Sequence, residues 1–287
     1  MAFPSNNNTD QNSELFANFV ADAEFAAYEN SVARSLVKVF DVPMNAGKTV
    51  QIPVWASITA ELITDESVAT AKTTNTTAPT ITLKEHVVYN QITDMLRDSA
   101  YGDVMAQLAD QSGRAIGESL DSMVFGEFSN FSSDLGSTST ELTTNLILQA
   151  ASTLRARKLT GPFFAVVHPN QAYNIKKQLT YVAQTNVPAL SMVGEGVLSA
   201  YYIGQVGGVT IIESPMVTAV TTGGATAHRS GVFAPSALGL AQRGGLDLNT
   251  LYLPAARATD MVLKAVAGAG VVQSTHGVAI TAESVLN

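Results

Sequence analysis

The stretch from Thr93 to Asn130 reads TDMLRDSAYGDVMAQLADQSGRAIGESLDSMVFGEFSN and decides how the rest of the chain must be arranged. Its apolar residues recur at steps of three and four, as on one face of an amphipathic helix. Thr93 is a suitable N-cap, and Asp94 and Asp98 suit the positive helix N-terminus. The predicted stripe consists of Leu96, Ala100, Val104, Leu108, Ala115, Ile116, Leu120, Met123, Val124 and Phe128.

A continuous helix over this stretch would span about 50 Å. Gly102, Gly113 and Gly117 each lower helix propensity, so we expect a bend. A helix of this length exceeds a small globular core. We therefore expect several other segments, or neighbouring subunits, to cover it.

The composition points to self-association. Hydrophobic residues make up 46% of the 287 residues and charged residues only 14%. A surface rich in Ser, Thr and Asn is one explanation. The other, which we favour, is that copies of the chain cover much of the surface, because interface cores are depleted in charge.

The net charge of −8, without any basic cluster, argues against direct binding of nucleic acid through phosphates. The absence of cysteine excludes disulfides, thiolate zinc sites and a cysteine nucleophile, and fits a reducing cytosol. The N-terminus lacks the features of a signal peptide, and the longest apolar run is too short to span a membrane. We expect a soluble chain that is not exported and has no membrane partner.

The N-terminal third predicts an arm, a helix and a projecting hairpin. Residues 1–12 are polar, and the pattern from Ser13, a candidate cap, to Phe40 is helical. Gly47–Trp55 and Thr80–Ile92 are rich in β-branched residues and partly alternate, as strands do. The polar, Thr-rich segment between them makes this a long β-hairpin, which needs a surface to lie on.

The rest of the chain predicts an α/β domain followed by returning strands. Its signals are a helix, an apolar run bounded by prolines and a second helix. The expected elements are a linker at 132–140, helices at 141–159 and 170–179, a buried strand at 162–169, loops at 180–199 and 223–230, short strands at 200–203, 208–212 and 231–233, and two or three longer strands within 247–280 that pack beside the long helix.

No catalytic, cofactor-binding or metal-binding pattern is present. The four histidines have no metal-ligand spacing, and His168 at the end of an apolar run suits a capping or core position. Gly47-Lys48-Thr49 lacks the earlier glycine of a phosphate loop, because Val42 occupies that position. Ser35-Leu36-Val37-Lys38 lacks the companion motifs of the enzymes that use S-x-x-K. We predict no cofactor and no enzymatic activity.

The hairpin supplies the candidate inter-subunit contacts. Ile52, Val54 and Trp55 are apolar residues on an element expected to be exposed, which suits an interface anchor. The paired carboxylates of Asp65 and Glu66 lie in an open polar tip, where a solvated turn is the simpler reading. Lys72 lies on the same tip. These six residues are the predicted contact set: Ile52, Val54, Trp55, Asp65, Glu66 and Lys72.

The order of these elements resembles the major capsid protein of tailed bacteriophages, the Hong Kong 97-type fold. Four segments are similar to that family: GPFFAVVHPNQAYN at 161–174, IGQVGGVTIIESP at 203–215, GVFAPSALGLAQR at 231–243, and the closing strand within 258–280 that contains GVVQSTHGVAI. The resemblance covers nearly the whole chain, and the order of elements carries it, since no single motif is specific.

The resemblance implies an α+β capsid fold. It has an N-terminal arm and helix (1–44), an extended β-hairpin loop (45–92) over the adjacent subunit, a peripheral domain with the spine helix (93–140 and 243–287) and an α/β axial domain (141–242). It further implies hexamers and pentamers that form an icosahedral shell around phage double-stranded DNA, bound without sequence specificity, in a virion assembled in the host cytoplasm.

The implied partners are further copies of the chain, a portal protein, a cement protein as an additional candidate, and a separate scaffolding protein. The last is expected because the N-terminal region is too short for the scaffolding segment of some relatives. Some relatives also crosslink a loop Lys to a neighbour's Asn, but no pattern around Lys72 supports a partner, so we predict no crosslink.

Three alternatives stay open on the sequence alone. An encapsulin-like nanocompartment shell resembles the same fold but encloses cargo enzymes. An α/β hydrolase-type enzyme would require a pocket of convergent polar groups. A tail or baseplate protein would form rings or tubes instead of a closed shell.

Overall fold

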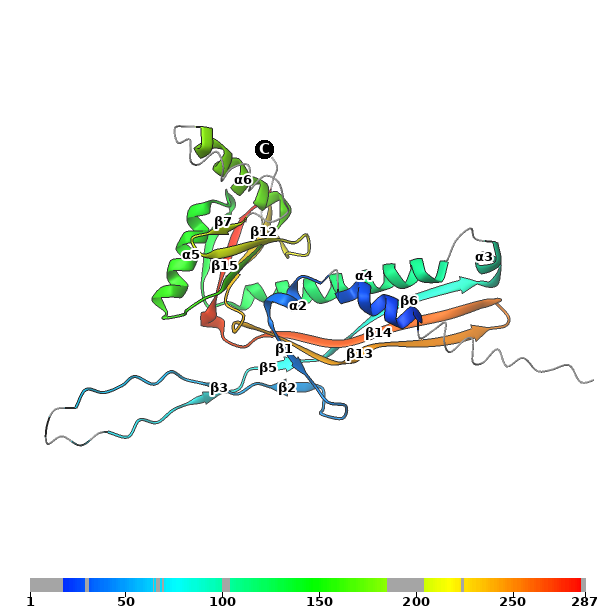
Figure 1. The fold of residues 1–287 in the computed structure, drawn as a ribbon, viewed down its shortest axis with the longest axis horizontal. Helices are drawn as coiled ribbons and strands as arrows, with labels where there is room; N and C mark the ends of the chain where they lie inside the picture. Colours follow the sequence, from blue (N-terminus) through cyan, green and yellow to red (C-terminus); the bar gives the residue numbers. More distant parts are fainter. Residues whose placement is uncertain are drawn as a thin grey trace, which may run out of the picture.

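The computed structural model describes residues 18–28, 31–63, 65, 68, 70–99, 104–184, 204–222 and 225–284. Figure 1 shows an elongated part, in which the long helix α4 lies along a four-stranded sheet, and a second α/β part at one end of it. A thin hairpin projects beyond the rest of the fold near the junction of the two parts. Each of the three pieces follows from a different sequence pattern.

The long helix is shorter than predicted. α4 runs from Val104 to Gly126 and is followed by the 3₁₀ turn η1 (Glu127–Asn130). The segment after Thr93 forms a separate short helix, α3 (Asp94–Ser99). The prediction of one helix over Thr93–Asn130 is therefore wrong, although Thr93 does cap α3, since its Oγ1 accepts a hydrogen bond from the Leu96 amide at 3.3 Å.

The predicted apolar stripe is buried along α4 but not along α3. Ile116, Val124 and Phe128 are each at most 1% exposed, whereas Leu96 is 48% exposed. Ala115 also faces solvent. Within the described residues, the stripe is buried where α4 packs against a sheet and another helix, and Ala100 of the predicted stripe lies outside the described residues.

Glycines in α4 serve close packing. A helix over residues 18–28 crosses α4, and a Cβ added at Gly113 would lie 2.2 Å from the Ala23 carbonyl oxygen. A Cβ at Gly117 would lie 2.9 Å from the Ala27 carbonyl oxygen. Because the two glycines are four residues apart, they lie on one face of α4 and let the helix backbones approach closely.

The four-stranded sheet has the order β1 (Lys38–Asp41), β13 (Leu238–Leu253), β14 (Ala258–Val271) and β6 (Lys84–Thr93). β1 is parallel to β13, and the other neighbours are antiparallel. Met261, Leu263 and Ala265 on β14 pack with Ile116 of α4 in one buried cluster. The prediction that returning strands pack beside the long helix is confirmed.

The second sheet has the order β7 (Asp134–Glu141), β15 (Gly277–Glu283), β12 (Ala225–Phe233), β8 (Phe163–Val167), β10 (Val209–Glu213) and β9 (Gln205–Val206), with β11 (Ala219–Thr222) paired to β12. Helices α5 (Thr144–Ala156) and α6 (Pro169–Gln184) pack against this sheet. Thr143 caps α5, and the α5 side chains Ile147 and Leu154 pack in one core with Ile211 of β10. The predicted helix, buried strand and second helix are confirmed.

Three local predictions for this part of the chain differ from the structure. The Ser/Thr-rich linker at 132–140 is largely the strand β7, which pairs in parallel with β15. Residues 225–230, predicted as loop, belong to β12. Residues 180–184 continue α6, while the predicted loop at 185–199 and the strand at 200–203 lie outside the described residues.

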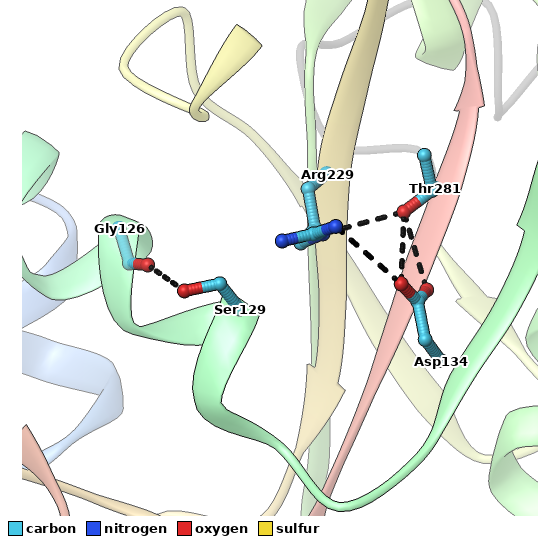
Figure 2. Close-up of polar contacts among 5 residues, drawn as sticks. All are labelled: Gly126, Ser129, Asp134, Arg229 and Thr281. Atoms are coloured by element: carbon cyan, nitrogen blue, oxygen red, sulfur yellow. Dashed lines mark hydrogen bonds and ion pairs between the residues drawn. The ribbon is translucent and has the colours of Figure 1, made fainter. Parts of the chain in front are cut away.

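A polar network explains why β7 holds its place despite having few apolar residues. In Figure 2, Asp134 of β7 faces Arg229 of β12 and Thr281 of β15. Thr281 Oγ1 lies 3.2 Å from both Asp134 carboxylate oxygens, and a guanidinium nitrogen of Arg229 lies 3.6 Å from Asp134 Oδ2. The same view shows Ser129, whose hydroxyl donates to the Gly126 carbonyl at the end of α4.

The hairpin is paired in two short ladders. β2 (Thr49–Gln51) pairs with β5 (Thr80–Thr82), and β3 (Val54–Trp55) pairs with β4 (Thr76–Thr77). The hairpin prediction is confirmed. Its predicted second strand, Thr80–Ile92, is divided, because β6 leaves the hairpin and joins β14 in the four-stranded sheet.

The N-terminal helical prediction is confirmed only in part. Residues 18–28 and α2 (Ala33–Leu36) are helical, but the following β1 is a strand where a helical pattern was predicted through Phe40. Ser13 and the arm at 1–12 lie outside the described residues. A last 3₁₀ turn, η2 (Ser274–His276), precedes β15.

Candidate assembly surfaces

The hairpin exposes apolar side chains that its own chain does not cover. Trp55 is 69% exposed, Ile58 66%, Leu62 95% and Val68 93%. In Figure 1 the hairpin extends away from both sheets, so the chain offers its outer part no packing surface. Two strands alone bury too little to be stable in water. Apolar exposure on such a ribbon is typical of an element that packs on another molecule.

The three apolar contact candidates lie at different depths. Ile52 is half-buried, because it packs on the small cluster of Val42, Ile81 and Leu83 at the base of the hairpin. Its amide also donates to the Pro79 carbonyl at 3.1 Å. Val54 is half-buried, and Trp55, the next residue on β3, is the most exposed of the three. Trp55 is therefore the residue of this set most available to a partner.

The polar contact candidates lie at the outer end of the hairpin. Asp65 is exposed, and Glu66 lies outside the described residues. Lys72 Nζ donates to the Thr59 carbonyl at 2.8 Å and so links the two sides of the hairpin. The structure does not bring Lys72 to Asp65 as an ion pair within the described part of the tip.

A second exposed apolar surface was not predicted from the sequence. The face of the four-stranded sheet opposite α4 carries Val87 (52% exposed), Tyr89 (57%) and Leu251 (62%). Val262, paired between Tyr89 and Asn249, lies on the same face. The alternation along β6 could have revealed it, because Val88 packs towards α4 while Val87 and Tyr89 point the other way.

A buried carboxylate fastens the N-terminal segment to the spine helix. Asp121 of α4 is 3% exposed and accepts hydrogen bonds from the Ser31 hydroxyl at 2.6 Å, the Val32 amide at 3.0 Å and the Ala33 amide at 3.1 Å. Burial raises the pKa of the Asp121 carboxyl, and the three donors act in the opposite direction. These contacts fix where the N-terminal segment joins α4.

The histidines form no metal centre among the described residues, where no cluster of three or more metal-ligating side chains occurs. His168 and His228 instead stack, with ring centroids 3.8 Å apart. Burial and the nearby His228 lower the pKa of His168 to about 4, and burial lowers the pKa of His228. His168 also accepts from the Asn170 amide at 3.3 Å at the start of α6, which agrees with the predicted capping role.

None of the described helices has the length and hydrophobicity that crossing a bilayer requires. The features that stand out are two exposed apolar surfaces, the projecting hairpin and the open sheet face. Exposed apolar surfaces of this kind are typical of contact with other macromolecules.

Comparison with known families decides which kind of protein uses this fold. Residues 76–281 match the family model of the phage capsid protein, which covers well over half of the chain. The chain belongs to the phage capsid protein family. No curated protein sequence matches it.

Solved structures from phages, several of them described as capsids, have the same fold. The capsid of Helicobacter pylori bacteriophage KHP30 matches with a TM-score of 0.70 at 11% identity, over 89% of this chain and 92% of that chain. The capsid of Cyanophage P-SCSP1u matches with a TM-score of 0.68 at 15% identity, over 89% of each chain. The structure of Mycobacterium phage Che8 matches with a TM-score of 0.63 at 19% identity, over 82% of this chain and 84% of that chain.

These matches confirm the resemblance to the Hong Kong 97-type capsid proteins and the α+β fold predicted from it. The chain is a structural, non-enzymatic protein of the phage capsid and belongs to the virion. The family that matches is that of phage capsids, which favours a phage shell over an encapsulin-like compartment and over a hydrolase.

Proposed function

We propose that copies of this chain assemble as hexamers and pentamers into an icosahedral shell that encloses phage double-stranded DNA. The observation that carries the proposal is the hairpin, which projects from a capsid fold with Trp55, Ile58 and Leu62 exposed. An adjacent copy would supply the surface that the hairpin lacks. A tryptophan such as Trp55 is the type of residue that contributes most to binding when it becomes fully desolvated.

The segments take the roles expected for such a shell. Residues 1–44 are the proposed arm and first helix, 45–92 the extended loop over the adjacent subunit, 93–140 with 243–287 the peripheral domain, and 141–242 the axial domain at the five- and six-fold axes. Most of β7 and all of β15 fall within the peripheral ranges, but both strands pair in the second sheet and so belong with the axial part. β6 belongs to the extended-loop segment but pairs with β14 of the peripheral sheet, which ties the loop to that domain. Ile52, Val54, Trp55, Asp65, Glu66 and Lys72 are the proposed contacts of the loop.

The net charge of −8 fits a shell that encloses DNA without binding it tightly, because phosphate binding requires clustered cations. The proposed partners besides the copies are a separate scaffolding protein, a portal protein and a cement protein. Assembly would take place in the host cytoplasm.

Sedimentation velocity with negative-stain microscopy tests this proposal on the full chain, expressed alone and with its candidate scaffolding protein. We expect closed particles or hexamer-sized rings. Deletion of residues 65–77 should abolish closure and leave the circular dichroism of the subunit unchanged. A monomer under every condition would overturn the proposal, and particles filled with protein cargo would favour the encapsulin-like alternative.

A further inference from the structure

One long edge of the four-stranded sheet has no partner within the described part of the chain. β6 is the outermost strand and pairs only with β14, while the strand at the opposite edge, β1, has four residues. β6 has ten residues, and Figure 1 shows it beside α4 along the elongated part. Among the described residues, no backbone hydrogen bond reaches residues 84–92 from the side away from β14. The backbone groups on that side are therefore available to another strand.

β6 lacks the features that usually protect an edge strand. Proteins blunt such edges with proline, bulges, short strands or charged side chains. The register of β6 with β14 runs from Lys84 to Thr93 without a bulge, no proline interrupts it, and both charged residues lie at its start. The centre consists of Val87, Val88 and Tyr89, which are residue types that favour strands. A long, regular edge of this kind is a template for a strand of another molecule.

The sequence of β6 is complementary to a second, antiparallel copy of itself. Residues that lie opposite each other must share a face of the sheet, so a residue with an odd number pairs with another odd one. With Val88 on the two-fold axis, residues 84–92 all pair, and Val87 lies opposite Tyr89 of the second copy. Aromatic and β-branched side chains form favourable cross-strand pairs. The two charged residues at the start of β6 then lie opposite the uncharged end of the other strand.

The helix that covers β6 leaves room for such a contact. The Asn90 amide group donates to the Ser112 hydroxyl at 3.0 Å. His86 Nδ1 lies 2.7 Å from the Ser119 hydroxyl. These contacts hold α4 on β6, and because α4 also packs on β14, its axis lies between the two strands.

Two α4 helices related by the two-fold axis would lie about 10 Å apart, which is the usual distance between packed helices. The flank of α4 beside β6 is marked by Ser112 and Ser119, and residues three or four positions away share it. Its exposed side chains are short and uncharged: Ala115, Ser119 and Ser122. The helices therefore do not keep the two strand edges apart.

We propose that two copies of this chain join edge to edge through β6, in antiparallel register with Val88 on the two-fold axis. The two four-stranded sheets then form one continuous sheet with a pair of α4 helices on one face. The contact is isologous, because each copy contributes the same surface. It deepens the proposed shell function and rests on that function for its place: head-to-tail contacts close a ring, and a two-fold contact joins one ring to the next.

Cysteine crosslinking on the full chain tests this contact, since the chain contains no cysteine of its own. In the proposed register the two Val88 Cα atoms lie about 4.5–5.5 Å apart, which a disulfide can span. Val88→Cys should therefore form disulfide-linked dimers when assembled protein is oxidised with diamide. Leu251→Cys is the matched control, because this exposed position lies on β13, and β14 and β6 separate it from the axis. Non-reducing electrophoresis should show about tenfold more dimer for Val88→Cys than for the control.

Two exposed positions test the register without changing the half-buried Val88. Residues directly opposite each other have Cβ atoms about 5 Å apart, and diagonal neighbours are about 7–8 Å apart. Particles assembled from equal amounts of Val87→Cys and Tyr89→Cys chains should therefore crosslink. Particles of either variant alone should give about tenfold less dimer.

The outcomes separate this contact from the proposed shell. Closed particles in which neither Val88→Cys nor the mixed variants crosslink would overturn the edge contact and leave the shell standing, with another segment covering β6. Equal crosslinking of Leu251→Cys and Val88→Cys would also overturn the contact, because random collision would then explain the dimers. Specific dimers from a protein that never forms rings or particles would support the contact and overturn the shell. Circular dichroism of each variant should match that of the wild type, and the mixed pair decides the result if Val88→Cys does not fold.

Discussion

Replacing Gly113 with Ala tests whether α4 and the helix over residues 18–28 are held together by close backbone contact. The new methyl group would lie 2.2 Å from the Ala23 carbonyl oxygen and 3.0 Å from the Ala23 carbonyl carbon and Cα. These are backbone atoms, so no side-chain rotation relieves the clash. The helix must shift by roughly 1 Å, which also disturbs the packing of Phe19 and Ile116 in the same cluster.

Two terms of opposite sign set the magnitude. Ala favours a helix over Gly by about 1 kcal/mol. Overpacking a tight contact costs about 1–3 kcal/mol or more, and this clash with backbone belongs at the upper end. We expect Gly113→Ala to lower the free energy of unfolding by about 2 kcal/mol, which lowers the urea midpoint of the unassembled subunit by roughly 0.5–1 M. Urea denaturation followed by circular dichroism measures this.

Gly126→Ala in the same region is the matched control. Gly126 has helical backbone angles (φ −59°, ψ −29°), and a Cβ there meets only Thr218 Oγ1 at 3.8 Å. It should therefore leave stability unchanged or raise it by up to about 1 kcal/mol. If Gly113→Ala were as stable as Gly126→Ala, the close-packing argument would be refuted.

Three further outcomes follow from the structure. Asp121→Ala should lower the free energy of unfolding by about 3 kcal/mol, because a hydroxyl and two amides lose their acceptor. Denaturation against urea measures this, with Asp121→Asn as the milder comparison. The lowered pKa of His168, about 4 against 6.5, means that the unfolded chain binds the proton more readily, so stability is present above pH 6.5 and is lost as the pH falls towards 4. Because the ring is partly exposed and solvent screens its charge, we expect the free energy of unfolding to fall by about 2 kcal/mol over this range. Replacing both His168 and His228 with Gln should make the urea midpoint nearly independent of pH between pH 6.5 and 4. Trp55 is the only tryptophan, so its fluorescence should shift to shorter wavelength when assembly buries the hairpin.

Each of these outcomes has a clear contrary result. A wild-type urea midpoint for Asp121→Ala would show that the carboxylate does not fasten the N-terminal segment. An unchanged slope between pH 6.5 and 4 in the double Gln variant would remove the stacked imidazoles as the cause of acid sensitivity. Emission from Trp55 that is identical in subunits and particles would mean that the hairpin stays exposed in the shell.

The elements that could be predicted carry their signal locally. Phe163–Val167 is a short apolar run bounded by prolines, and the hairpin strands are rich in β-branched residues around a polar tip. Thr93 and Thr143 cap helices by contacts with residues three positions on. Patterns of this kind depend on neighbours in sequence, so the sequence suffices to find them.

The elements that were missed depend on distant partners. β7 contains few apolar residues, and its strand conformation comes from pairing with β15 and from Asp134 binding Arg229 and Thr281. The helical spacing of apolar residues begins at Thr93 and includes α3, so it predicted one continuous helix. These apolar residues are buried only where another part of the fold covers them. From the sequence alone, Gly113 predicted a bend. In the structure it lets α4 approach the backbone of Ala23 in another helix.

The candidate surfaces show the same division. Trp55 could be predicted, because a tryptophan on a two-stranded hairpin has little to pack against. The open sheet face around Tyr89 shows in the alternation along β6, but which side of the strand stays uncovered required knowing that β6 pairs with β14 beside α4. Contacts across such separations come from the tertiary fold.

A cryo-electron microscopy reconstruction of assembled particles tests the central claim most directly. The account predicts closed shells in which the hairpin of each subunit crosses onto the adjacent copy, with Trp55 buried in that contact. A hairpin that folds back on its own subunit, or that points into solvent in a complete shell, would contradict the account.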